Sequence, residues 1–284
     1  MQKHDNRPIG IFDSGVGGLT VLTQIKKALP NESLIYVGDT ANAPYGGKTP
    51  EELLKHARDI IHFLQSQNVK AVVLACGTTS STVYEQLSCE NPDIPLIDVI
   101  RPGAEYCIGL TSQTTQAAVP HSTCTSNIAP PRLGLIATAA TIKSGLFAKL
   151  VKAQRPDIQL LTQACPLFAP MAEAGQAHSK AATWAAETYI GHWRGKIDAL
   201  ILGCTHYPLL ENALTHALGQ DMQYINLATH TAQSLKAQLA NNLNSGATPP
   251  QHKFYVSGNP TDFNKTARFI LNHAPEAEKL PPIY

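Results

Sequence analysis

Two cysteines of the chain stand at equivalent places, each at the end of an apolar run. Cys76 ends the run 71–76 and Cys204 ends the run 199–204. Each run has the length and the flanks of a buried parallel strand that leads into a helix. Because ligands of open α/β sheets bind beyond the carboxyl ends of the strands, both thiols are predicted to lie where chemistry usually takes place. Two thiols at equivalent places in two halves of a chain suggest one substrate held between them.

A pair of thiols facing one substrate suits the inversion of a carbon stereocentre that carries a hydrogen. One thiolate removes the proton from one face, while the opposite thiol delivers another proton to the other face. An unperturbed thiol has a pKa near ~8.5, so modest tuning supplies either form near neutral pH. The helix predicted after each cysteine favours the thiolate through its partial positive charge. The polar side chains adjacent to the two thiols are Thr78, Thr79, Ser80, Thr205 and His206.

The remaining cysteines lack this setting, and we interpret them as structural or incidental: Cys89, Cys107, Cys124 and Cys165. No two cysteines form a CxxC pair, so a zinc site is not expected. Charged residues make up 15% of the 284 residues, and the net charge is +1. Nucleic-acid and membrane partners are therefore not expected. No run approaches the ~18 apolar residues of a membrane span, and residues 1–7 are too polar for a signal peptide, so a cytoplasmic protein with reduced thiols is predicted.

Strand-like and helix-like segments alternate almost throughout the chain. This alternation predicts an α/β fold in which mainly parallel sheets are flanked by helices. The predicted strands are 9–13, 34–38, 71–76, 95–100, 133–137, 158–163, 199–204, 223–227 and 254–257. Helices are predicted at 50–67, 143–153 and 172–193.

A weak internal repeat divides the chain into two halves. The first cysteine follows Ile11 by 65 residues, and the second follows Leu135 by 69 residues, at corresponding points of two similar segments. We expect two similar domains from a duplicated unit, with the active site in the cleft between them, although any two βαβ units look alike at this level. The strand 254–257 is expected back on the first domain. The predicted domains are therefore 1–100 plus 226–284, and 101–225.

A glycine-rich turn, 13–18, follows the first predicted strand and opens a helix. Glycines there permit a tight turn and leave backbone N–H groups open to an anion. A dinucleotide site would need the pattern GxGxxG and a ribose-binding acid such as Asp39, but the third glycine position is Thr20. Asp13 is better placed to orient a neighbouring thiol or ammonium group than to face a pyrophosphate.

Three segments are predicted to be loops. Residues 39–48 follow the second strand and carry Pro44, Tyr45 and Gly46, which fit either an ordinary turn or a loop that binds a small ligand. Residues 112–131 are rich in Ser, Thr, Gln and Pro and are expected to form a mobile surface loop. Residues 241–252, with Asn, Gly and two prolines, are expected to form another loop.

Several long motifs closely resemble those of the glutamate racemases, cofactor-independent enzymes that make D-glutamate for bacterial peptidoglycan. The resemblance covers the chain nearly from end to end. The segments that carry it are 9–20, 38–40, 44–46, 75–76, 140–145, 164–168, 202–209 and 254–258, with GIFDSGVGGLT and LGCTHYPL among them.

This resemblance implies a role for each residue of the site. Cys76 is expected to act on the D-enantiomer and Cys204 on the L-enantiomer, with Asp13 assisting the first and Glu173 and His206 assisting the second. No cofactor and no metal are implied, and the family is usually homodimeric. The implied substrate contacts are Asp13, Ser14, Pro44, Tyr45, Gly46, Gly77, Thr78, Thr138, Thr141, Thr205 and His206.

The chain departs from the usual family pattern at two points. Gly77 stands where Asn commonly follows the first cysteine, which removes a side-chain amide that Thr79 or Ser80 would have to replace. Asn226 and Leu227 stand where an Asp-Ser or Asp-Pro pair is common. A racemase for aspartate or another amino acid is the nearest alternative function. A dinucleotide-dependent oxidoreductase and a binding protein without turnover are the alternatives from other classes.

Overall fold

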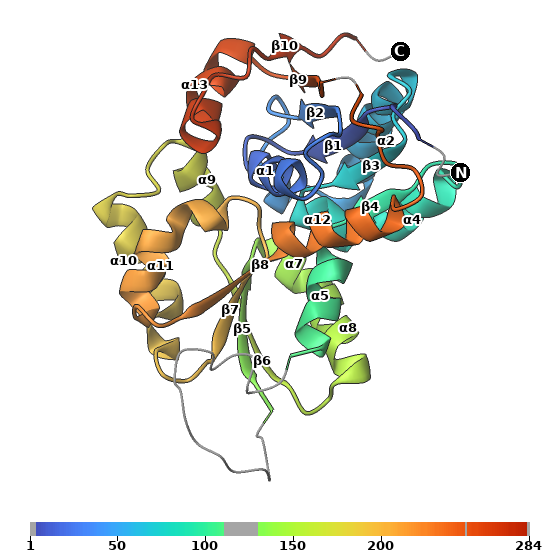
Figure 1. The fold of residues 1–284 in the computed structure, drawn as a ribbon. Coiled ribbons are helices and arrows are strands. Elements are labelled where there is room, and N and C mark those ends of the chain that lie inside the picture. Colours follow the sequence, from blue (N-terminus) through green and yellow to red (C-terminus); the bar gives the residue numbers. More distant parts are fainter. Residues whose placement is uncertain (1–3, 111–129, 248, 283–284) are drawn as a thin grey trace.

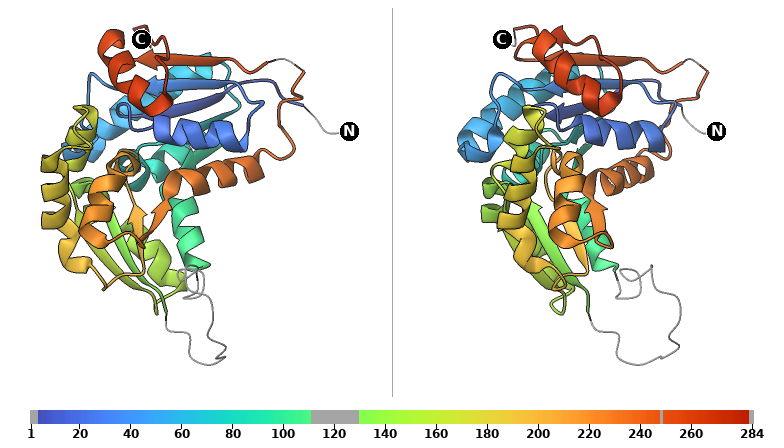
Figure 2. Two further views of the ribbon diagram at one scale, coloured as in Figure 1. Left: turned by 60° about the vertical axis from the view of Figure 1, so that its left-hand side comes forward. Right: turned by 90° about the vertical axis from the view of Figure 1, so that its left-hand side faces the viewer.

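The computed structural model describes residues 4–110, 130–247 and 249–282. The predicted loop 112–131 lies almost entirely outside these residues. The described residues form two parallel sheets flanked by helices, as the alternating pattern predicts (Figure 1). In the views of Figures 1 and 2 one sheet lies above the other.

The first sheet has six parallel strands in the order β10-β9-β2-β1-β3-β4. Its central strands are apolar and buried on both faces, as expected where helices cover both sides. The C-terminal strands return to this sheet, where β9 pairs with β2. A discontinuous first domain requires this return, and the domain boundaries themselves stay a prediction. The strands are β1 (Ile9–Asp13), β2 (Leu34–Gly38), β3 (Ala71–Leu74), β4 (Leu96–Asp98), β9 (His252–Val256) and β10 (Glu278–Lys279).

The second sheet has four parallel strands in the order β6-β5-β7-β8. Every predicted strand of the chain is present, with ends that differ by no more than two residues. The strands formed by the two apolar runs, β3 and β7, each end two residues before the cysteine. The exposed two-residue strand β10 was not predicted, because it has no apolar pattern. The strands of this sheet are β5 (Arg132–Ala137), β6 (Gln159–Ala164), β7 (Ala199–Leu202) and β8 (Gln223–Asn226).

Two of the predicted helices are wrong in their bounds, and glycines explain why. The helix expected at 143–153 is divided by Gly145 (φ 64°), which ends α7 (Ala139–Ser144) and precedes α8 (Leu146–Gln154). The helix expected at 172–193 is likewise interrupted after α9 (Phe168–Glu173) by Gly175 (φ 70°). A second helix, α10 (Lys180–Ile190), follows and is capped by Ser179, whose hydroxyl accepts a hydrogen bond from the Ala182 N–H.

The third predicted helix, at 50–67, agrees with the structure to within one residue. The helix α2 (Pro50–Ser66) begins at a capping box, in which Thr49 and Glu52 satisfy each other's backbone N–H groups. Asn226 caps the helix that follows β8, so the departure from the family pattern there leaves an ordinary helix start. The remaining helices are α1 (Leu19–Ala28), α3 (Gly77–Thr82), α4 (Tyr84–Glu90), α5 (Ile100–Ile108), α11 (Glu211–Leu218), α12 (Leu227–Gln238) and α13 (Pro260–Leu271).

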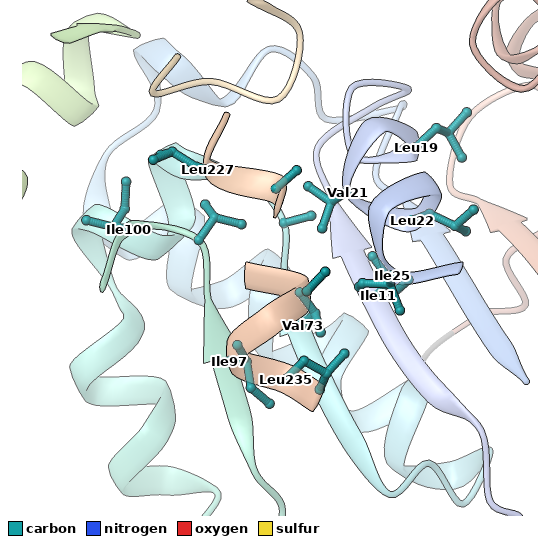
Figure 3. Packing of buried hydrophobic residues seen from close by; sticks show 14 of the residues in the cluster. Ile11, Leu19, Val21, Leu22, Ile25, Val73, Ile97, Ile100, Leu227 and Leu235 are labelled. Atoms are coloured by element: carbon teal, nitrogen blue, oxygen red, sulfur yellow. The ribbon is translucent and has the colours of Figure 1, made fainter. Parts of the chain in front are cut away.

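The two sheets share one continuous hydrophobic cluster. Helices α5 and α12 follow β4 and β8, pack against each other, and extend the core of the first sheet toward the second. Figure 3 labels Ile100 and Leu227 from these helices together with Val21 of α1 and Val73 of β3, which belong to the same cluster. The burial of these side chains fixes the edges of both sheets relative to each other. Within the described ranges no helix is long and apolar enough to cross a membrane.

A buried ion pair ties distant segments of the first half together. Lys70 lies 2.7 Å from a carboxylate oxygen of Glu32, and the two side chains are only 1% and 2% exposed. The ammonium group also donates to the carbonyl oxygens of Asp5 and Asn242. The other carboxylate oxygen accepts a hydrogen bond from the Asn244 N–H. The pair therefore joins the N-terminal segment, the segment after α1 and the loop after α12.

Replacing Lys70 by Met should lower the free energy of unfolding by about 3–5 kcal/mol, because it leaves a buried carboxylate without its cation. The double variant Lys70→Met, Glu32→Leu should recover part of this loss, since no charge then remains buried. Urea unfolding curves measure both effects, with the exposed Lys27→Met on α1 as the matched control. A loss no larger than that of the control would contradict the assignment.

Candidate active site

The carboxyl ends of β1, β3, β5 and β7 converge on a cavity of about 650 Å³ between the two sheets. Residues from both halves of the chain line it. Asp13 and Thr141 lie just behind its wall, with 0% and 2% exposure. The predicted site residues in the lining are Ser14, Pro44, Tyr45, Gly46, Cys76, Gly77, Thr78, Thr138, Glu173, Cys204, Thr205 and His206. The structure therefore brings the whole predicted set to one place.

Cys76 lies two residues beyond β3, directly before the first residue of α3. Its pKa is raised to about 11, first by burial and then by the negative charge of Asp13, whereas hydrogen bonding from Thr79 acts in the opposite direction. The helix start acts in the expected direction through the Thr79 N–H, but desolvation outweighs it, so the pKa of Cys76 rises overall. At neutral pH Cys76 carries its proton, which is the form that can act as an acid.

Asp13 ends β1 and is fully buried beside Cys76. One carboxylate oxygen accepts a hydrogen bond of 3.0 Å from the Gly15 N–H. Burial raises the pKa of Asp13, while the positive charge of His206 and the N–H groups of Gly15 and Gly18 hold it down. A carboxyl group with a raised pKa next to a protonated thiol can exchange a proton with it.

The second thiol has different partners. Cys204 Sγ lies 3.6 Å from His206 Nδ1, and the opposite ring nitrogen lies 2.6 Å from Glu173 Oε1. Burial alone would lower the pKa of His206, but its hydrogen bonds to Cys204 and Glu173 raise it well above the usual value. Burial raises the pKa of Glu173, but the hydrogen bond and charge of His206 and the Val16 N–H lower it overall. The pair is therefore an imidazolium and a carboxylate, placed to exchange a proton with Cys204.

Three threonine hydroxyls form a chain between the two halves. Thr78 Oγ1 lies 2.9 Å from Thr138 Oγ1, which in turn lies 3.0 Å from Thr141 Oγ1. Thr138 also caps α7 by accepting a hydrogen bond from the Thr141 N–H. Among the described residues that line the cavity none is lysine or arginine. A carboxylate entering the cavity would therefore meet hydroxyl and backbone N–H donors, and among the described lining residues the only cationic side chain is the His206 imidazolium, which is already paired with Glu173.

The loop that carries Pro44, Tyr45 and Gly46 is held from beneath by Asp39. The buried Tyr45 hydroxyl donates to Asp39 Oδ2 at 2.5 Å, and Ser257 and Asn42 donate to the other oxygen at 2.5 and 2.9 Å. The Tyr45 hydroxyl is thus occupied, and the loop presents backbone to the cavity. Asp39 serves this loop, not a nucleotide ribose. Sequence reasoning missed this role because Ser257 lies 218 residues away in the chain.

Cys165 also lines the cavity, although the sequence alone made it structural or incidental. It follows β6 directly, at the same sheet edge as Cys204, and that position at the carboxyl end of a strand was the available signal. Burial, and then the charge of Cys204, raises the pKa of Cys165.

Neither residue suggested as a substitute for the missing amide at position 77 lines the cavity. The Thr79 side chain is fully buried, and the Ser80 hydroxyl donates to the Leu74 carbonyl. In the described part of the chain no group of three or more His, Cys, Asp and Glu side chains is arranged for a metal ion.

The fold and the paired thiols define an α/β protein with one thiol from each half in a single cavity, an arrangement suited to an isomerase. The family model Asp/Glu/Hydantoin racemase matches residues 9–235, and the chain belongs to this family. The resemblance found in the motifs is confirmed by curated relatives. The glutamate racemase of Geobacter metallireducens is 39% identical over 268 residues, covering 93% of each chain. That of Streptococcus suis is 36% identical and covers 93% of this chain and 94% of its own.

Solved structures agree with this family membership. The glutamate racemase of Francisella tularensis in complex with D-glutamate superimposes with a TM-score of 0.83 at 34% identity, covering 97% of this chain and 98% of its own. A glutamate racemase isoform of Bacillus anthracis gives a TM-score of 0.84 at 32% identity, covering 99% and 100%. The aspartate racemase of Picrophilus torridus shares the fold, with a TM-score of 0.56 at 15% identity, 84% of this chain and 96% of its own being covered.

The raised pKa of Cys76 predicts how it reacts with iodoacetamide. Its alkylation rate should rise about tenfold per pH unit between pH 7 and pH 10, because only the thiolate reacts. Asp13→Asn should move this rise to lower pH by removing a neighbouring negative charge, whereas the exposed Asp93→Asn should not. Peptide mass spectrometry after timed alkylation gives the rate at Cys76. A rate that reaches its plateau below pH 9 in the unaltered protein would contradict the assignment.

Proposed function

We propose that this protein is a glutamate racemase, which interconverts L- and D-glutamate without a cofactor. The observation that carries the proposal is that one strand-end thiol from each half lines the same cavity, each with a titratable group beside it. The relatives named above, including one crystallised with D-glutamate, support glutamate as the substrate. A cavity rich in hydroxyl and backbone donors is suited to a small molecule with two carboxylates.

The proposed reaction moves one proton off Cα and another onto it. From L-glutamate, the Cys204 thiolate takes the Cα proton and becomes a thiol, leaving a carbanion. The Cys76 thiol then donates its proton to the opposite face and becomes a thiolate, so the carbon regains four bonds with inverted configuration. From D-glutamate the two cysteines exchange roles. The protonated state of Cys76 suits the first direction.

Each turnover leaves the two cysteines with exchanged protonation states, so the protons must be reset. We assign this task to the side chains beside each thiol. His206, held by Glu173, can pass a proton to or from Cys204, and Asp13 can do the same for Cys76. The hard step is forming the carbanion, and exclusion of water together with positioned hydrogen-bond donors lowers its energy.

We assign substrate contacts to the backbone and hydroxyl groups that line the cavity. The threonine chain and the backbone N–H groups of Tyr45 and Gly46 lie where they can donate hydrogen bonds to the carboxylates. We further propose that the D-glutamate produced serves peptidoglycan synthesis and that the protein is a cytoplasmic homodimer, as the family resemblance implies. Light scattering during size-exclusion chromatography measures the oligomeric state.

Circular dichroism of pure L-glutamate tests the proposed function, with the dialysed protein and no added cofactor. The optical signal should decay to zero, and L-aspartate and other amino acids should lose theirs much more slowly. A requirement for added NAD would favour an oxidoreductase. An unchanged optical signal with every amino acid would favour a binding protein. A faster loss of signal with L-aspartate than with L-glutamate would show that aspartate, not glutamate, is the preferred substrate.

Cys76→Ala and Cys204→Ala should each reduce racemisation by about 10²- to 10⁴-fold or more, because each removes the acid or base for one face. The exposed Cys89→Ala is the matched control and should keep full activity. Thermal melting confirms that each variant folds. Racemisation near the normal rate in either of the first two variants would refute the two-base assignment.

A further inference from the structure

The two halves of the chain touch through backbone at the cysteines themselves. Gly77 directly follows Cys76, and Gly203 directly precedes Cys204. A Cβ added to Gly77 would lie 2.6 Å from the carbonyl oxygen of Gly203, which is closer than such atoms can approach. The absence of a side chain at position 77 therefore permits this approach. The chain departs from the usual family pattern at this same position, where Asn is common.

Other glycines of the first half also face the second half closely, but with a difference. A Cβ on Gly15 would meet the carboxylate of Glu173, and one on Gly17 would meet the side chains of Thr205 and His206. Those are side-chain atoms, which can turn aside. The atom opposite Gly77 is a backbone carbonyl oxygen, which moves only with its chain segment.

The segment of Gly203 is held from behind and cannot retreat within its own half. Its N–H donates to the Ile136 carbonyl at 2.8 Å. A Cβ on Gly203 would lie 2.8 Å from that same oxygen and 2.9 Å from the side chain of Ala137, which shows how closely it packs on β5. A group wedged at position 77 therefore has to move the two halves apart.

We propose that Gly77 is a positioning residue that sets the separation between the thiols of Cys76 and Cys204. This inference rests on the proposed racemase activity. An added methyl group needs roughly 0.5–1 Å more space to reach normal contact. One thiol then lies too far from Cα to complete the inversion. Gly77 is at the start of a helix and its φ is not positive, so alanine is compatible with the backbone itself.

A hydrogen bond at the same junction also holds the two halves of the chain close together. The buried Thr20 hydroxyl lies 3.0 Å from the carbonyl oxygen of Thr205 and 2.9 Å from that of Gly17. It thus joins the helix after the glycine turn to the residue that follows Cys204. The glycine turn, which fails the dinucleotide pattern at Thr20, contributes to this contact between the halves.

Gly77→Ala should lower kcat by about 10- to 100-fold with little change in KM, since misplacement by less than 1 Å affects the reacting atoms more than substrate binding. In deuterium oxide, carbanions that the distant thiol fails to protonate return to their starting configuration. Deuterium in recovered substrate, relative to deuterium in product, should therefore rise above the ratio of the unaltered protein. Gly109→Ala, whose Cβ meets only ordinary contacts, is the matched control.

If Gly77→Ala does not fold, Thr20→Val tests the same junction, because it removes the hydrogen bond to Thr205 without adding a group between the halves. Thr20→Val should also raise the ratio of deuterium in recovered substrate to deuterium in product. Thr20→Ser, which keeps the hydroxyl, should return this ratio to that of the unaltered protein. Crystal structures of the unaltered protein and Gly77→Ala should show a longer distance between the two sulfurs in the variant. An unchanged sulfur separation, or an unchanged deuterium ratio in both variants, would overturn the proposal. Absence of racemisation by the unaltered protein would instead refute the proposed function, and the sulfur separation still tests the role of Gly77.

Discussion

The burial of two thiols at the junction of two sheets is the constraint on which the rest of the structure depends. Neither half holds a complete site, because each supplies one cysteine and the charged groups that serve it. Burial makes a thiolate costly, which raises the pKa of Cys76 to about 11. The same low dielectric strengthens the ion pair of Glu173 and His206 beside Cys204. The junction therefore fixes where the thiols lie and keeps the Cys76 thiol protonated at neutral pH.

The two walls of the cavity are alike in fold but unlike in chemistry. Both cysteines follow the third parallel strand of a similar unit, yet one has a buried carboxyl group as its neighbour and the other an imidazolium. In the proposed reaction one thiol gives a proton while the other takes one, and the unlike neighbours provide each thiol with its own partner for proton exchange. The Val16 N–H, which binds Glu173 across the junction, shows that each half also orients the acid-base groups of the other.

The sequence predicts the parts of this structure that depend on local pattern. Apolar runs locate the strands, and their ends place each cysteine at the carboxyl edge of its own sheet. The positions of Glu173 and Thr138 came from motif resemblance, because no local pattern marks them. Tertiary contacts decided what remained. Asp39 meets Ser257 across 218 residues, the pKa of Cys76 depends on burial by the whole fold, and the contact of Gly77 with Gly203 exists only when both halves are in place.

The central claim, that two bases act on opposite faces of one carbon, is tested most directly by the origin of the incoming proton. L-glutamate is incubated with the protein in deuterium oxide, and the enantiomers are separated at low conversion for mass spectrometry. Thiols exchange protons rapidly with water, so the D-glutamate formed in the first turnovers should carry deuterium at Cα. The remaining L-glutamate should stay largely protonated. Substantial retention of the original hydrogen in D-glutamate would mean that a single base moves one proton between faces, and would contradict the roles given to Cys76 and Cys204.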